Sequence, residues 1–361
     1  MVIMEPATPA LLKSAVVGCG RIGVASSERL AGRAHPSMLP VSHAECMMAS
    51  GRYHLAAFCD PFVERARDAS TFYRTGTPFA DVATMLAEVK PDVVSVATRT
   101  QERPGIVTLL AEQGVRGIYA DKPFSRSLTE CQAAMSAVKK AGVKLALGTS
   151  RRYTRVYRRA REIAASGLLG RLAQVRVQLD PGCPLLWTMP HLVDLLVFFS
   201  GGRDVAYVQA TCGIPAHTVK DNVIDCDPAV EAVTMRFDNG IIGTMHAGAR
   251  LGVALVCEHG EVHVFEQRPM VRIIHGPTSS GHGMSDELID DTMSGTVRAF
   301  TELADAVQGN GPSPVTSEDV LLNQALLAGI AWSSLQDGRR IQLAEVPPDL
   351  IITGRVGELY A

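Results

Sequence analysis

A glycine-rich signature near the N-terminus has the residue types and spacing needed to bind a dinucleotide. An apolar run at residues 15–17 ends in the pattern Gly18-x-Gly20-x-x-Gly23. The first glycine permits a tight turn out of a strand, the second lets the backbone approach a pyrophosphate, and the third lets the next helix pack on the strand. Free N–H groups at that helix N-terminus would face the phosphates. The signature predicts a cofactor site made of Gly18, Gly20, Arg21, Ile22 and Gly23.

An acidic residue follows the second strand-like segment, residues 54–59. At the tip of such a strand, the Asp60 carboxylate would accept hydrogen bonds from the adenosine ribose and repel a 2′-phosphate. Asp60 therefore favours NAD, although Arg65, five residues later, leaves NADP possible.

The first part of the chain alternates short apolar segments with amphipathic ones. Strands are predicted at residues 14–18, 54–59, 93–97, 117–120 and 144–148, and helices at 61–71, 81–88, 105–113 and 129–141. We expect Thr129 to cap its helix and Gly142 to follow the helix end. Alternation of this kind is typical of a parallel, doubly wound sheet. Residues 1–149 are therefore predicted to form a Rossmann dinucleotide-binding domain.

An insertion interrupts the helix expected after the glycine signature. Asp60 lies 37 residues beyond Gly23, where about 20 is usual, and prolines at 36 and 40 break the segment 26–52. We expect a loop around residues 31–41 and a resumed helix around 42–50. Residues of types that can ligate a metal occur here at His35, His43, Cys46 and His54. Their spacing matches no standard zinc pattern, so no metal site is predicted.

After residue 149 the pattern changes to a helix followed by strand-like segments. A helix is predicted at 155–166, strands at 172–179, 207–211, 231–237, 241–247, 253–258 and 261–265, and closing helices at 296–307 and 317–336. Tight turns at 238–240 and 259–260 indicate hairpins. Residues 150–361 are therefore predicted to form an α/β domain with an open, mostly antiparallel sheet for substrate binding and oligomerisation. Its C-terminal helices could pack back on the first domain.

Three further segments carry polar side chains that could do chemistry. Ala97-Thr98-Arg99-Thr100 and Asp121-Lys122-Pro123 follow strands of the first sheet, whose carboxyl ends line such a crevice. His191-Leu192-Val193-Asp194 opens an apolar helix that stops at Gly201-Gly202. Lys122 could hydrogen-bond a reacting oxygen and move its proton, and His191 is a second acid/base candidate.

Together these segments resemble the glucose–fructose oxidoreductase/inositol dehydrogenase (Gfo/Idh/MocA) family, over nearly the whole chain. The family's marks are an N-terminal G-x-G-x-x-G, a Glu-Lys-Pro motif and a D-x-x-x-H stretch. The resemblance implies an NAD(P)-dependent oxidoreductase of sugars, cyclitols or sugar acids that packs as a homodimer or homotetramer through its open sheet. It also implies that Thr98, Asp121 and Lys122 contact the cofactor and that Lys122 and His191 are catalytic.

The chain departs from the family pattern around the predicted site. Asp121 replaces the motif Glu, and Arg99 stands where the family has Pro. Trp187 replaces the Asp four residues before His191. Because a tryptophan presents a flat apolar ring, we expect a more apolar pocket in which Trp187 stacks on a substrate ring or packs in the core. The predicted substrate-binding residues are Trp187, Asp194, Arg152 and Tyr153, and Asp194 alternatively orients His191 or caps the helix.

Composition narrows the class of partner. The net charge is −2, so a small-molecule substrate is expected rather than nucleic acid. The arginine-rich run 151–159 is interpreted as a solvated helix face. No apolar run is long enough to span a bilayer, and eight scattered cysteines indicate a reducing compartment. We therefore expect a cytoplasmic protein without membrane contact.

Three other functions stay open at this point. The first is an NAD-dependent but net-redox-neutral glycoside hydrolase or lyase. The second is a biosynthetic imine or ketone reductase, which an apolar pocket would suit. The third is a non-catalytic dinucleotide sensor, which the missing family Asp would permit.

Overall fold

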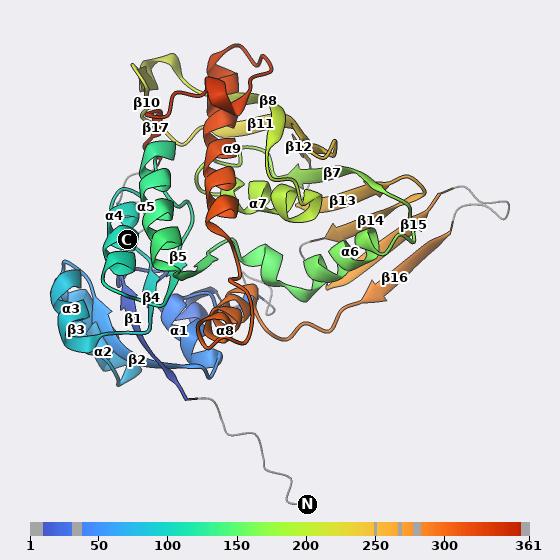
Figure 1. The fold of residues 1–361 in the computed structure, drawn as a ribbon. Helices are drawn as coiled ribbons and strands as arrows, with labels where there is room; N and C mark the ends of the chain where they lie inside the picture. Colours follow the sequence, from blue (N-terminus) through green and yellow to red (C-terminus); the bar gives the residue numbers. More distant parts are fainter. Residues whose placement is uncertain (1–9, 31–37, 249–250, 266–268, 277–282, 355–361) are drawn as a thin grey trace, which may run out of the picture.

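The computed structural model describes residues 10–30, 38–248, 251–265, 269–276 and 283–354. Figure 1 shows a sheet flanked by helices in the blue and teal part of the chain, and a broad second sheet in the green to orange part. Helix α9 (Ser317–Leu335), in red, runs beside the second sheet, and α8 (Gly295–Val307), in orange, lies beside α1 (His43–Ala49) of the first part.

The first sheet is parallel and has the strand order β3-β2-β1-β4-β5-β6. The chain reverses its direction of growth between β1 and β4, and the crevice outside the carboxyl ends of the strands at such a point is where ligands bind. The predicted doubly wound sheet is therefore confirmed, and only β3 had not been expected. The bounds are β1 Leu12–Val17, β2 Tyr53–Cys59, β3 Thr77–Phe79, β4 Val93–Val96, β5 Gly117–Ala120, β6 Lys144–Leu147, α2 Val63–Tyr73, α3 Val82–Val89, α4 Arg103–Glu112 and α5 Leu128–Ala141.

The cap of α5 differs from the prediction. Ser127, not Thr129, caps the helix, because Ser127 is extended and its hydroxyl accepts the Glu130 N–H. Thr129 already lies inside the first turn, where its hydroxyl donates to the Pro348 carbonyl. Gly142 ends the helix with φ +68°, a conformation that glycine adopts without strain.

The insertion after the glycine signature is looped out of a helix that then continues. The Ile22 and Gly23 carbonyls accept hydrogen bonds from His43 and Ala44 at 2.9 and 3.0 Å, as successive turns of one helix would. A short helix η1 (Ser27–Leu30) is held to α1 by Glu45, which accepts the Ser27 N–H. The resumed helix is confirmed as α1, and part of the predicted loop, 31–37, lies outside the described residues.

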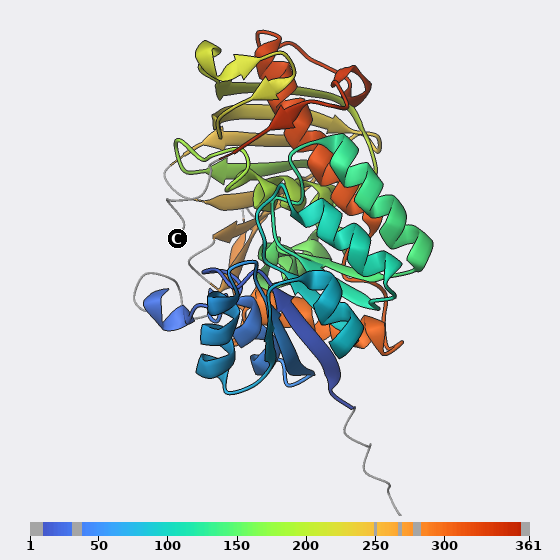
Figure 2. The same cartoon turned by 90° about the vertical axis from the view of Figure 1, so that its left-hand side faces the viewer.

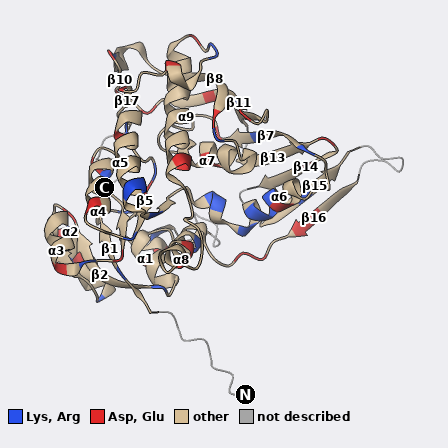
Figure 3. Ribbon diagram, in the orientation of Figure 1, with Lys and Arg blue, Asp and Glu red and all other residues tan. Residues whose placement is uncertain are grey.

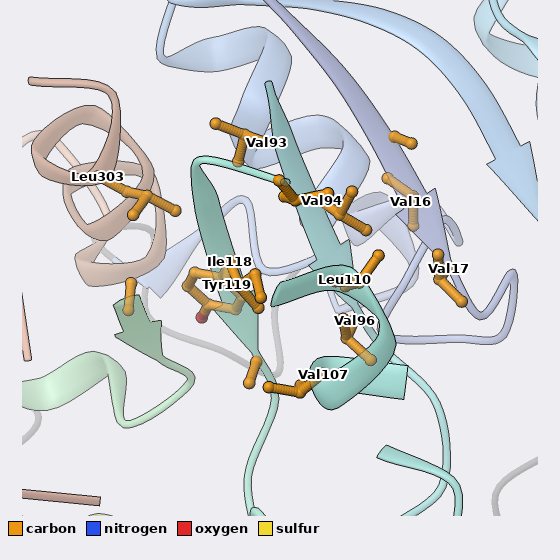
Figure 4. Packing of buried hydrophobic residues seen from close by; sticks show 14 of the residues in the cluster. Val16, Val17, Val93, Val94, Val96, Val107, Leu110, Ile118, Tyr119 and Leu303 are labelled. Atoms are coloured by element: carbon orange, nitrogen blue, oxygen red, sulfur yellow. The ribbon is translucent and has the colours of Figure 1, made fainter. Parts of the chain in front are cut away.

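Valines of the central strands form the middle of the first core (Figure 4). Val93, Val94 and Val96 of β4 are fully buried, and burying one such side chain contributes about 1.5–3 kcal/mol. Leu303 of α8 belongs to the same cluster as Ile118 of β5. The C-terminal part of the chain therefore returns to complete the first core.

The second sheet is mostly antiparallel, as predicted. Its order is β16-β15-β14-β13-β7-β12-β11-β8, and β7 with β12 is its parallel pair in the described chain. Figure 2 shows these strands stacked, with helices over one side. The bounds are β7 Leu172–Leu179, β8 Val205–Gly213, β11 Ala229–Phe237, β12 Ile242–Ala247, β13 Gly252–Cys257, β14 Gly260–Phe265, β15 Met270–His275, β16 Met284–Leu288, α6 Arg155–Ala165 and α7 Met189–Ser200.

Five strands of this half were not predicted. The edge strands β15 and β16 belong to the large sheet, and a small sheet joins β9 (Val219–Lys220), β10 (Val223–Ile224) and β17 (Ile351–Ile352). The two-residue strands are too short for periodicity to mark them. Strand β17 pairs with β10, although their residues lie more than a hundred positions apart in the chain.

His43 lies in the core of the first domain and predicts a pH-dependent stability. Its Nδ1 is 2.6 Å from the Ser95 hydroxyl and its ring meets Tyr119 edge-on. Burial lowers the pKa of His43 from 6.5 to about 4. Between these values the unfolded chain binds a proton that the folded chain does not, so stability is lost as the pH falls from 6.5 towards 4. The expected loss between pH 7 and 5 is about 2 kcal/mol.

Urea unfolding midpoints at pH 7 and pH 5 measure this loss. The variant His43→Gln should lose less stability than the wild type over the interval. The matched control is His54→Gln, because His54 is exposed, and it should keep the wild-type loss. An unchanged pH dependence in His43→Gln would contradict the assignment.

Candidate functional site

The three glycines of the signature make a cradle that a dinucleotide fits. Gly18 has φ +94°, and a Cβ there would lie 2.7 Å from the Ala97 carbonyl carbon. A Cβ on Gly23 would lie 2.0 Å from the Gly18 oxygen, whereas one on Gly20 would meet no protein atom within 4 Å. The outer glycines are therefore required by the fold, and Gly20 faces open space where a phosphate can approach.

Gly20 allows cofactor binding to be tested separately from folding. In Gly20→Val, the new side chain has room in the protein but fills the space above the loop. We expect the Kd for NAD, measured by calorimetry, to rise about tenfold or more, with an unchanged melting temperature. Gly105→Val is the control, because Gly105 on α4 is exposed and equally uncrowded. Wild-type affinity in Gly20→Val would contradict this location.

Asp60 is fixed at the tip of β2 beside the glycine loop. Its two carboxylate oxygens accept the Cys19 N–H at 2.9 Å and the Phe62 N–H at 3.0 Å. Each oxygen keeps a further lone pair for a ribose hydroxyl. The Arg65 guanidinium lies 4.8 Å from the centre of the Phe62 ring.

Thr98 follows β4 and carries an unpartnered polar atom. Its Oγ1 is buried and has no hydrogen-bond partner among the described residues, a condition that a bound ligand would relieve. The buried Arg103 holds this region together, because its guanidinium donates to the carbonyls of Thr98 and Pro123. The loops after β4 and β5 are thereby tied side by side at the crevice.

Lys122 follows β5 and meets Trp187 across the two domains. Its Nζ lies 4.3 Å from the centre of the Trp187 indole and donates to the Trp187 carbonyl. Burial lowers the pKa of Lys122 to about 8. Asp121 and Asp227 oppose this shift, whereas Arg151 adds to it. Lys122 can therefore exchange a proton near neutral pH.

Helix α7 begins at Met189, two residues before His191, which had been expected to open the helix. His191 therefore lies in the first turn of α7. Its Nδ1 is buried and has no hydrogen-bond partner within the described ranges. Burial, followed by the charges of Arg151 and Lys122, holds the pKa of His191 well below 6.5. At neutral pH it is an uncharged imidazole, able to share a hydrogen bond with an alcohol.

Trp187 is not a core residue. The residue is 45% exposed, and its indole lies against the Lys122 ammonium. Of the two roles considered from the sequence, only the first agrees with this exposure.

Three of the predicted substrate contacts have structural roles instead. Arg152 donates from Nε to the Asp194 carboxylate at 2.8 Å, and a second nitrogen lies 2.8 Å from the other oxygen. Tyr153 is fully buried, with its hydroxyl 3.4 Å from the Leu147 carbonyl oxygen. The polar groups of these three residues are bonded inside the protein. We therefore infer that the three residues support α7 and do not bind the substrate.

Sequence reasoning missed Asp227, which precedes β11. Its carboxylate accepts the Leu186 N–H at 2.7 Å, directly before Trp187, and it raises the pKa of Lys122. Forty positions separate Asp227 from Trp187 (227 − 187), so no local pattern could have joined them. Arg151 was signalled only by the arginine-rich run.

That run is only partly the solvated helix face that we expected, because Arg155 is exposed whereas Arg152 is buried. The side chains of Arg158 and Arg159 form ion pairs with Glu302 and Glu287, and the Arg155 guanidinium donates to the Asp290 carbonyl. The run therefore ties α6 to later parts of the chain.

The described ranges contain no group of three His, Cys, Asp or Glu side chains that could hold a metal ion. None of their helices combines the length and apolar character needed to cross a membrane.

Comparisons with known proteins agree with this geometry. The model of the oxidoreductase family with an NAD-binding Rossmann fold matches residues 12–149. The scyllo-inositol 2-dehydrogenase (NAD(+)) of Bacillus subtilis is 23% identical over 355 residues, covering 92% of this chain and 96% of the relative. The D-apiose dehydrogenase of Paraburkholderia graminis is 28% identical over 189 residues, covering 52% of this chain and about half, 48%, of that relative.

A solved structure shows the same fold. The oxidoreductase from Agrobacterium radiobacter, in complex with NAD+, L-tartaric acid and magnesium, has a TM-score of 0.71 at 18% identity, covering 93% of this chain and 99% of that one. The glycine cradle, Asp60 and the two-domain architecture thus coincide with a matching family model and relatives named as dehydrogenases. Residues 12–149 match the oxidoreductase family with an NAD-binding Rossmann fold, and the named relatives support a Gfo/Idh/MocA-type dehydrogenase with NAD as its cofactor.

Proposed function

We propose that this dehydrogenase oxidises a secondary hydroxyl of a sugar, cyclitol or sugar acid, with Lys122 and His191 handling the proton. The observation that carries the proposal is the Lys122 amine after β5. It has a pKa of about 8, lies against the Trp187 ring and is close enough to His191 to lower its pKa.

Each protein group has a defined task in this reaction. NAD, when bound at the glycine loop and Asp60, would supply the hydride acceptor. As the C–H bond breaks and the C=O bond forms, the neutral Lys122 amine takes the hydroxyl proton and becomes an ammonium. Neutral His191 orients the same oxygen by a hydrogen bond. Trp187 offers its ring to the carbon face of the substrate.

Cofactor choice follows from Asp60. A buried carboxylate at the ribose position disfavours a 2′-phosphate. Arg65 is stacked on Phe62 and would have to leave that ring to bind one. We therefore propose a preference for NAD over NADP.

Relatives support the substrate class by their names, which include D-apiose, scyllo-inositol and D-glucoside dehydrogenases. The absent family Asp at position 187 favours a substrate with an apolar ring face. Assembly through the open sheet stays a prediction, as do the cytoplasmic location and the division of the chain at residue 149.

The deciding experiment follows nicotinamide absorbance with NAD or NADP and a panel of sugars, cyclitols, glucosides and sugar acids. Carbonyls and imines are tested in the reverse direction. We expect saturable NAD reduction with at least one member of the alcohol panel. Substrate cleavage without net NADH would favour the redox-neutral hydrolase or lyase. Confirmed NAD binding with no conversion by chromatography would overturn the proposal in favour of a sensor.

A further inference from the structure

A cavity rich in arginine lies between α6, α7 and the start of α9. Its volume is about 530 Å³, within the range of small-molecule sites. Lys122, His191 and Trp187 are not among its lining residues, so it is separate from the proposed reaction site. Figure 3 shows the blue basic stretch along α6 that contributes to it. Its charged lining residues are Arg152, Arg158, Arg161, Arg203, Glu162 and Asp319.

Two of these arginines are fixed by carboxylates. Arg152 forms the buried pair with Asp194. Arg158 binds Glu302 through both terminal nitrogens, at 2.6 and 2.8 Å. These two ion pairs hold this side of the cavity in place before a ligand binds, and their carboxylates balance the two arginine charges.

The other two arginines hold unused donors. In the described part of the chain, no carboxylate lies within ion-pair distance of Arg161, whose guanidinium is 4.5 Å from the centre of the Phe198 ring. Arg203 contacts Asp319 through Nη1 at 3.0 Å. Partial burial lowers the pKa of Arg161, and the nearby charges of Arg152, Arg158 and Arg203 lower it further, against the opposing charge of Asp319. A bound anion would relieve this repulsion.

We propose that this cavity binds a small metabolite that carries at least two negative charges as phosphate or carboxylate groups. Asp194 and Glu302 balance Arg152 and Arg158, and Glu162 is paired with Arg159 outside the lining. Arg161 and Arg203 against Asp319 therefore leave a local charge of +1 (2 − 1). The planar guanidinium fork matches both oxyanions bidentately. Phe198, Val197 and Pro314 supply an apolar wall for the carbon skeleton. The proposal is independent of the dehydrogenase reaction.

Calorimetric titration of the full chain with inorganic phosphate, pyrophosphate and citrate tests this site. All titrations are made at constant ionic strength with saturating NAD, so that the glycine cradle is already filled. Saturable binding is expected for pyrophosphate, citrate or both, and the comparison separates phosphate from carboxylate ligands. In the double variant Arg161→Gln/Arg203→Gln, we expect the Kd to rise at least about tenfold.

The control variant removes the same charge elsewhere. Arg67 and Arg171 are exposed and lie outside the cavity lining, so Arg67→Gln/Arg171→Gln should bind the anion as the wild type does. Retained anion binding by Gly20→Val would confirm that the site is separate from the dinucleotide loop. No saturable binding by the wild type, or equal loss in both double variants, would overturn the proposal. Binding of acidic peptides or nucleic acid in place of all three small anions would also overturn it.

Discussion

Replacing Lys122 with methionine is expected to lower kcat by about 10²–10⁴-fold, the usual range for a lost acid/base group. Methionine keeps much of the side-chain volume against Trp187 but cannot accept the hydroxyl proton. The Kd for NAD should change little, because the glycine loop and Asp60 are untouched. Steady-state kinetics with the best substrate of the panel, together with an NAD titration, measures both quantities.

Lys140→Met is the matched control. Lys140 is exposed on α5, so this variant removes the same charge without approaching the crevice and should keep wild-type kcat. Activity of Lys122→Met within twofold of the control would exclude Lys122 as the proton acceptor.

The pH profile gives Lys122 an independent signature. Alcohol oxidation needs the neutral amine, so kcat/KM should rise with pH and level off above about 8. Carbonyl reduction needs the ammonium and should fall over the same interval. Since the Asp227 carboxylate raises the pKa of Lys122, Asp227→Asn should move both limbs to lower pH. If the pH at which kcat/KM changes were the same in Asp227→Asn as in the wild type, coupling between Asp227 and Lys122 would be excluded.

Replacing Asp194 with alanine is expected to destabilise the protein by up to about 3–5 kcal/mol, because it leaves the buried Arg152 charge with only the more distant Asp319 carboxylate, 3.7 Å away. Arg152 and Asp194 side chains are only 8% and 4% exposed and share two 2.8 Å contacts. Burial raises the pKa of Asp194 to about 6, against the opposing charge of Arg152, so the carboxylate is ionised at neutral pH. Urea unfolding at pH 7 measures the loss.

Two further variants separate the unpaired charge from lost packing. Arg152→Met/Asp194→Leu removes both charges, and much of the stability should return, because apolar residues of similar volume can replace a buried ion pair. Glu64→Ala removes one partner of the exposed Arg67–Glu64 pair and should cost less than about 1 kcal/mol. If Asp194→Ala cost no more than Glu64→Ala, the pair would not support α7 as we infer.

Much of the fold could be predicted because its signals are local. The apolar segments that became β1, β2, β4, β5 and β6 end within one residue of their expected ends. Gly18 and Gly23 follow from backbone geometry that the signature itself specifies. The edge strand β16 carries a mixed polar sequence with four of its five residues exposed, so neither alternation nor hydrophobicity could mark it.

The sequence by itself determined the cofactor cradle and the two candidate acid/base residues, because Gly18, Gly20 and Gly23, Lys122 and His191 belong to short motifs. Only the tertiary structure decided which charges surround these residues and how deeply they are buried. It joined Arg152 to Asp194, placed Asp227 beside the Trp187 segment, and brought the Lys122 amine onto the Trp187 ring. These contacts connect residues 40 or more positions apart. Charge and burial act through space, so they depend on how the two domains pack rather than on neighbours in the chain.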